Sequence, residues 1–242
     1  MQTIHVEEAE GRVRLRLLAQ RVDVHVLREL SAALDHIEDK VTAPIVVLHV
    51  QSEGMAFSEW DPDGALDIHG FNTWEKLVTR LERLRKLTVA VADGPCHGPG
   101  LQLLLACDLR VATPSAGFSL PEVTQGYLPG MAIWRLGRYV GLGRAKRIVL
   151  SGEVLSADEA LGLGILDGVS ADALLAEQSG VAMLGPAHAV AGTLARRLLL
   201  ESFDTQNEDA LGHFLAAQAR AIAQPAFADT VRRQRRAAGD EA

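Results

Sequence analysis

Cysteine is scarce in this chain, with Cys96 and Cys107 the only two in 242 residues. They form no Cys-x-x-Cys pair, and nothing around them indicates a secretory context. This usage favours reduced thiols in a cytoplasmic protein over a disulfide framework.

Long apolar runs and an excess of positive charge are also lacking. No run approaches the roughly 20 residues that a membrane-spanning helix needs. The acidic start, MQTIHVEEAEGRVRL, has no apolar core, so we expect no export signal. The net charge of −7 argues against a nucleic-acid partner. We interpret the one basic cluster, VRRQRR at 231–236, as a solvated helix end.

What the chain has is apolar residues, 48% of the total, in patterns that alternate between strand and helix. This content and length suit one large domain with a smaller appendage. An alternating order of strands and helices indicates an α/β layered fold. We predict strands at 12–19, 45–50, 88–93, 109–113 and 117–120, helices at 24–38 and 71–87 with Asn72 as a cap, and a loop at 51–70.

A run of helices follows residue 130, over 131–140, 143–150, 156–162, 171–181, 187–203 and 207–235. The last two are long and are set apart by Gly185-Pro186. We therefore place a boundary there, with a core at 1–185 and a helical region at 186–242.

Two turns that follow buried strands are candidates for chemistry, one at 94–100 and one at 54–62. Backbone N–H groups at such a turn can hold a developing oxyanion. Any α/β protein has several such turns, so the alternative for each is a turn that only connects a strand to a helix and has no role in chemistry.

A carboxylate that lies among apolar residues is the third candidate. Glu122 follows Pro121 in SLPEVTQGYLPG, residues 119–130. If this loop packs inward, burial raises the pKa of Glu122 and suits it for proton transfer. The alternative is an exposed glutamate in a turn.

The stretch 89–169 resembles the crotonase (enoyl-CoA hydratase/isomerase) superfamily. The resemblance lies in G-x-x-x-G-x-G before an apolar helix, then Cys-Asp, F-x-x-P-E-x-x-x-G-x-x-P-G and L-S-G. It implies an α/β fold of ββα units in a spiral, with C-terminal helices that form a trimer or a dimer of trimers. It also implies an acyl thioester substrate, usually acyl-CoA, whose carbonyl lies between two backbone N–H donors. No prosthetic group and no metal are expected.

The chain departs from the family pattern at both catalytic elements. The family's hydratases have two glutamates 20 residues apart; the second matches Glu122, and the first falls on Gln102, which is no general acid or base. The second oxyanion donor falls on Pro99, which has no N–H, so Gly100 is the remaining candidate. The first donor falls in AFSEWDP, on Trp60 or Asp61.

Two further residues are candidates by position. His97 lies beside the turn and can act as an acid, a base or an orienting group, although a histidine at a strand end is more often structural. Tyr127 lies five residues after Glu122 and either reaches the pocket or packs in the core.

These departures leave three hypotheses. The first is a lyase or isomerase that acts through an enolate, by dehydration or isomerisation. The nearest resemblance is to crotonase-like proteins that assist a type III polyketide synthase in making 3,5-dihydroxyphenylacetyl-CoA for 3,5-dihydroxyphenylglycine, an antibiotic building block. The second is an impaired subunit that supports such a synthase or a crotonase-fold paralogue. The third is an ordinary enoyl-CoA hydratase.

Overall fold

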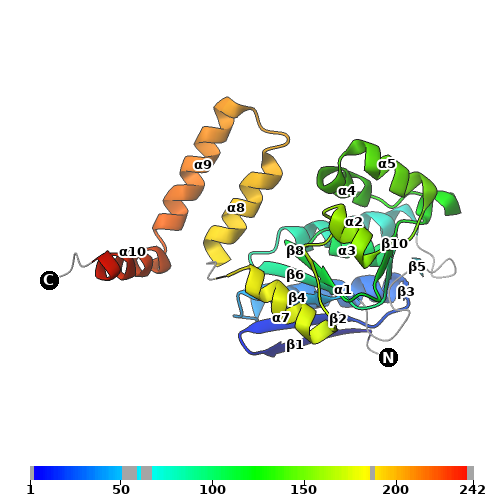
Figure 1. The fold of residues 1–242 in the computed structure, drawn as a ribbon, viewed down its shortest axis with the longest axis horizontal. Coiled ribbons are helices and arrows are strands. Elements are labelled where there is room, and N and C mark those ends of the chain that lie inside the picture. The colour runs from blue at the N-terminus through cyan, green and yellow to red at the C-terminus, as the bar shows by residue number, and fades with distance from the viewer. Residues whose placement is uncertain (1–2, 51–58, 61–66, 186–188, 239–242) are drawn as a thin grey trace. The chain divides into compact units, whose positions relative to one another are not determined.

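The computed structural model describes residues 3–50, 59–60, 67–185 and 189–238 (Figure 1). The chain divides into two compact units, Met1–Gly185 and Pro186–Ala242. The first unit contains the sheets and the candidate site, and the second contains helices.

A six-stranded sheet forms the centre of the first unit. All of its neighbouring strands are parallel except the first pair, which is antiparallel. Every residue of β6 is buried, as expected for a parallel strand covered on both faces. The strands, in their order across the sheet, are β1 (Ile4–Ala9), β2 (Arg12–Leu17), β4 (Ile45–His49), β6 (Leu87–Ala92), β8 (Leu109–Ala112) and β11 (Gly168–Val169).

The edge strand β1 is a feature that the sequence analysis missed. Its segment, IHVEEA, carries Glu7 and Glu8, both exposed, and only Ile4 of the strand is buried. The acidic residues obscure the strand pattern. It stands at the end of the strand order and pairs with β2 on one side, so among the described residues it is an edge of the sheet.

Helices α1 (Val24–Asp39) and α2 (Ile68–Glu82) bury their apolar faces in the larger core. Asp67 caps α2 by accepting hydrogen bonds from the N–H groups of His69 and Gly70, at 2.9 and 3.0 Å. The prediction of Asn72 as the cap was wrong, because Asp67 caps the helix five residues earlier.

The opposite face of the sheet carries α7 (Ala173–Met183), which packs on β6 and β8 over a smaller core (Figure 1). Gly180 lets this helix approach closely. A Cβ added there would lie 2.6 Å from Cγ1 of Val89 and 3.1 Å from Cγ2 of Val111. The glycine therefore sets the distance between the helix and the sheet.

A three-stranded sheet, ordered β10 (Leu155–Ser156), β9 (Gly117–Ser119) and β7 (Pro95–His97), lies next to the candidate site. The short helix α3 (Pro99–Leu104) follows β7, and the 3₁₀ helix η1 (Glu122–Gln125) follows β9. Because β7 and β9 are parallel neighbours, their carboxyl ends bring α3 and η1 to the same edge.

The remaining elements of the first unit are short. A second small sheet pairs β3 and β5 in parallel, and α4 and α5 pack against each other. These elements, together with the short helix α6, have the bounds Arg21–Val22 for β3, Glu59–Trp60 for β5, Ala132–Val140 for α4, Leu142–Ser151 for α5 and Ala157–Gly162 for α6.

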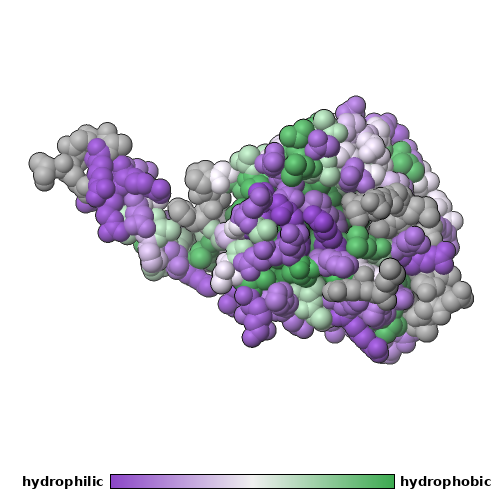
Figure 2. Space-filling model, turned by 90° about the horizontal axis from the view of Figure 1, so that it is seen from below, coloured by the Kyte–Doolittle hydropathy of each residue, from purple (hydrophilic) through white to green (hydrophobic). Residues whose placement is uncertain are grey.

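The second unit consists of α8 (Ala189–Glu201), α9 (Asn207–Ile222) and α10 (Pro225–Ala238). The prediction of one helix over 207–235 was wrong, because Pro225 starts a new helix. Helix α10 appears hydrophilic in Figure 2. Among the described residues, no helix is long and apolar enough to span a bilayer.

Candidate active site

Gln102 and Glu122 are joined by a hydrogen bond in the buried interior. The side-chain amide of Gln102, on α3, donates from Nε2 to Oε1 of Glu122 at 2.9 Å. Glu122 is the first residue of η1 and is fully buried, and Gln102 is 1% exposed. The two positions that the family resemblance singles out are therefore side by side.

Trp74 extends this pair into a line of three side chains. Its indole Nε1 on α2 donates to Oε1 of Gln102 at 2.7 Å. Trp74 was not among the predicted site residues, because in the sequence it is one residue of the amphipathic stretch 71–87. A buried tryptophan usually finds an acceptor for its N–H, so the residue type was the available signal.

The second oxygen of Glu122, Oε2, is buried and has no hydrogen-bond partner among the described residues. Burial raises the pKa of Glu122, and its own backbone N–H and the hydrogen bond from Gln102 oppose that rise only in part. A raised pKa suits a carboxyl group to taking up and releasing a proton during a reaction.

The turn before α3 is shaped by Gly98, whose φ of 47° lies in a region that side chains rarely adopt. Its N–H donates to the carbonyl of Ser119 at 2.9 Å. Pro99 is the first helical residue and Gly100 the second, and both are buried. The N–H of Gly100 belongs to the first turn, where the helix itself offers no acceptor.

His97 faces Ser119, with its Nδ1 and the serine Oγ 2.8 Å apart in a hydrogen bond. Burial lowers the pKa of His97, which favours the neutral ring. Within the described part of the chain, no hydrogen bond joins His97 to Gln102 or Glu122.

Tyr127 is half-buried, and its hydroxyl donates to Oε1 of Gln125 at 2.9 Å. Its backbone N–H donates to the carbonyl of Glu122 at 3.0 Å, which closes the turn after η1. Trp60 is in β5 by its backbone, and the neighbouring Asp61 lies outside the described residues. The first oxyanion donor predicted for this loop therefore stays a prediction.

A second buried carboxylate, Glu177 on α7, lies in a network of cations. Its Oε1 is 3.2 Å from Nη1 of Arg12 and 2.8 Å from Nη2 of Arg14, and its Oε2 is 2.9 Å from Nε2 of His49. Burial works against the charge of Glu177, but the hydrogen bonds from Arg14 and His49 outweigh it, so its pKa is lowered. This network fastens α7 to β2 and β4.

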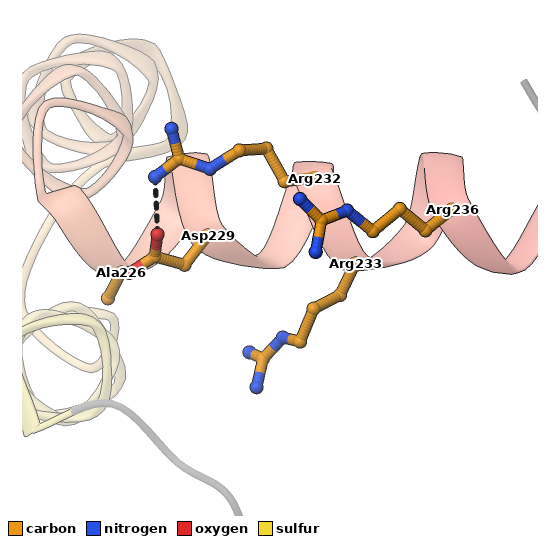
Figure 3. A pocket seen from close by; sticks show the side chains of 5 residues that line it. All are labelled: Ala226, Asp229, Arg232, Arg233 and Arg236. Atoms are coloured by element: carbon orange, nitrogen blue, oxygen red, sulfur yellow. Dashed lines mark hydrogen bonds and ion pairs between the residues drawn. The ribbon is translucent and has the colours of Figure 1, made fainter. Parts of the chain in front are cut away.

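The basic cluster at the C-terminus lies on α10, where Ala226, Asp229 and three arginines line a shallow hollow (Figure 3). Arg232 is paired with Asp229, and Arg236 lies in the last turn, where cations complement the helix dipole. Across the described ranges, no group of three or more His, Cys, Asp or Glu residues is arranged to hold a metal ion.

Comparison with known proteins identifies the family of the chain. The family model described as enoyl-CoA hydratase/isomerase matches residues 21–237. An enoyl-CoA hydratase of Amycolatopsis orientalis is 40% identical over 197 residues, which are 81% of this chain and 88% of that protein. A probable enoyl-CoA hydratase of Mycobacterium leprae is 30% identical over 209 residues, 77% of this chain and 80% of the relative.

Solved structures show the same fold. A crystal structure of an enoyl-CoA hydratase from Thermoplasma volcanium superposes with a TM-score of 0.87 at 20% identity, covering 96% of this chain and 97% of that one. These similarities confirm the predicted crotonase fold, with its C-terminal helices. The chain belongs to the enoyl-CoA hydratase/isomerase family.

Proposed function

We propose that the chain converts an acyl thioester, carried by coenzyme A or by a carrier protein, through an enolate, with Glu122 as the residue that transfers the proton. One observation carries this proposal: Glu122 is fully buried, accepts a hydrogen bond from the side chain of Gln102 at Oε1, and has a second oxygen with no partner among the described residues. A carboxylate in that setting is a stronger base than one in water.

Dehydration or isomerisation fits this site better than hydration. Hydration in the family pattern uses two carboxyl groups, and the second position holds the amide of Gln102. One carboxylate is sufficient for isomerisation, because it takes a proton from one carbon and returns it to another. In dehydration the proton taken from C2 goes to the leaving hydroxyl, which departs as water and regenerates the carboxylate.

The N–H of Gly100 is our candidate donor to the enolate oxygen. Pro99 occupies the usual donor position and has no N–H. Loss of one such donor typically costs about 2.7–4 kcal/mol of transition-state stabilisation, so a replacement matters. Gly100 follows Pro99 at the start of α3, and its buried N–H has no acceptor within the helix.

The test is exchange of the C2 protons of acetyl-CoA, butyryl-CoA and phenylacetyl-CoA in D₂O, followed by mass spectrometry. We expect exchange by the wild type and a fall of about 10²- to 10⁴-fold in Glu122→Gln. Glu7→Gln, at an exposed carboxylate, is the matched control and should exchange as the wild type does. Equal exchange by Glu122→Gln, or its absence in the wild type, would overturn the assignment.

A second candidate function is that of a subunit that assists a partner synthase. Pro99 and Gln102 favour it, since each replaces a group that the family's hydratases use. Because of the resemblance described above, the partner to test is a type III polyketide synthase. Stimulation of that synthase that survives Glu122→Gln supports assembly, whereas stimulation lost in the variant supports chemistry on a polyketide thioester.

The hydratase alternative and the oligomeric state can each be measured directly. Rapid hydration of crotonyl-CoA by the wild type would favour an ordinary hydratase over both candidates above. A trimer or a dimer of trimers, formed through residues 186–242, should be visible by light scattering of the whole chain.

A further inference from the structure

The orientation of the Gln102 side chain is settled by its neighbour Trp74. An amide can present either its oxygen or its nitrogen to a partner, and the two are hard to distinguish by shape. An indole N–H can only donate, so the group facing Trp74 Nε1 at 2.7 Å is the amide oxygen. The nitrogen of Gln102 then faces Glu122.

This orientation constrains the carboxyl group of Glu122. Its Oε1 lies 2.9 Å from an amide nitrogen that can only donate, so Oε1 accepts. A proton on Oε1 would point at another donor. Oε1 is therefore an acceptor both when Glu122 is charged and when it is neutral. When Glu122 is neutral, its proton is on Oε2.

We propose that Trp74 is a positioning residue that, acting through Gln102, confines the transferable proton of Glu122 to Oε2. This rests on the proposed function of Glu122 and adds which atom does the work and what enforces it. Oε2 is buried and has no partner among the described residues, so it is the oxygen left to meet a substrate proton.

Removal of the indole N–H releases the constraint. In Trp74→Phe the amide of Gln102 can turn over, and its oxygen can then accept a proton from Oε1 of Glu122. The variant therefore stabilises the protonated acid and hides its proton in the hydrogen bond with Gln102. The pKa of Glu122, which burial already raises, should rise further.

The first measurement needs no substrate. The carboxyl carbons of ¹³C-labelled glutamates are followed by NMR against pH, and the Glu122 signal is identified by its loss in Glu122→Gln. We expect the titration midpoint to move up by about one pH unit in Trp74→Phe. An unchanged midpoint would overturn the proposal.

A double-mutant cycle separates positioning from packing damage. Gln102→Met removes the amide at similar volume, and it too should raise the midpoint. Adding Trp74→Phe to Gln102→Met should then cause no further shift, because Trp74 acts through the amide. A full additional shift would contradict the proposal.

Leu77→Val is the matched packing control, since Leu77 is also buried on α2 and does not take part in the hydrogen-bonded line. It should leave the midpoint unchanged, whatever its effect on melting temperature. If Trp74→Phe does not fold, Trp74→Leu, which also lacks the indole N–H, takes its place in the titration and in the cycle.

Kinetics give an independent readout on the thioester that exchanges fastest. Trp74→Phe should lower kcat about 10-fold with KM little changed, and its acid limb should move to higher pH. If Glu122→Gln is inactive and Trp74→Phe has the wild-type pH profile, only the positioning proposal fails. If Glu122→Gln stays active, the proposed function fails.

Discussion

Glu122 and Glu177 are both buried carboxylates, with exposures of 0% and 2%, yet their surroundings are opposite. Glu122 accepts a hydrogen bond from a neutral amide and keeps an oxygen without a partner among the described residues. Glu177 has cations or a histidine at both oxygens. The pKa of the first is raised by burial, whereas that of the second is lowered by its partners.

The difference shows that burial alone does not decide what a carboxylate does. Surrounded by donors and cations, Glu177 is held in its charged form and joins α7 to β2 and β4. Glu122, which has only neutral donors around it among the described residues, has a pKa that burial raises. The first arrangement stabilises the fold, and the second leaves a group available for proton transfer.

The largest effect should come from Gln102→Glu, which gives Glu122 a carboxylate neighbour. Trp74 can still donate to the new side chain, so the geometry should persist. We expect hydration of crotonyl-CoA to rise by about 10²- to 10⁴-fold above the wild-type level, because a second acid/base group is restored. Hydration that stays at the wild-type level would show that more than Gln102 separates this site from a hydratase.

Glu177→Gln should mainly affect stability. Removing the carboxylate leaves the part-buried guanidinium groups of Arg12 and Arg14 with only the exposed Glu10 as a charge partner among the described residues, at a cost of about 1–3 kcal/mol. Denaturant unfolding measures the loss, and deuterium exchange at C2 should stay within a few-fold. A variant as stable as the wild type would contradict the role given to the network.

The pH dependence of stability should run in opposite directions for the two residues. Because the folded pKa of Glu177 is lowered, its contribution is present above the ordinary value of 4.5 and is lost as pH falls through the folded pKa. The folded pKa of Glu122 is raised, so its contribution is full below 4.5 and is lost as pH rises through the raised value.

Unfolding free energies measured from pH 3 to 8 check this contrast. Glu177→Gln should remove part of the acid-side loss, and Glu122→Gln should remove part of the decline toward neutral pH. A steeper decline toward neutral pH in Glu122→Gln would show that Glu122 is not held neutral by burial.

The smallest effect should come from His49→Gln. The amide nitrogen of glutamine can occupy the place of Nε2 and donate to Oε2 of Glu177. We expect unfolding free energy within about 1 kcal/mol of the wild type. His49→Leu, which offers no donor, is the comparison and should cost more, about 1–3 kcal/mol. Equal costs would show that the imidazole contributes by packing.

Much of the fold followed from the sequence where apolar residues form unbroken runs. The strands at β4 and β6 and the helix α1 were predicted because burial on both faces, or on one helical stripe, leaves a clear pattern. Strand β1 was missed because acidic residues interrupt it, and Pro225 was overlooked as the start of α10.

Some residues of the candidate site were likewise predicted from the sequence, and others were not. Glu122 was a candidate from its apolar surroundings in the sequence, whereas its pairing with Gln102 came from the family resemblance, because 20 residues of sequence do not by themselves bring two side chains together. Trp74 was missed because α2 is far from both in the chain, and its contact depends on how helices pack. Glu177 escaped notice because its partners are on strands more than 120 residues away.

The acidic edge strand has a consequence for how copies of this chain meet. An edge strand offers unpaired backbone groups to which another strand can add. On β1 such an addition would bring the exposed carboxylates Glu7 and Glu8 of one copy against those of another. Repulsion between these carboxylates opposes the addition of a strand to this edge. Such protection matters here because the strands of a largely parallel sheet pair slowly during folding, which leaves its edges exposed to aggregation for longer.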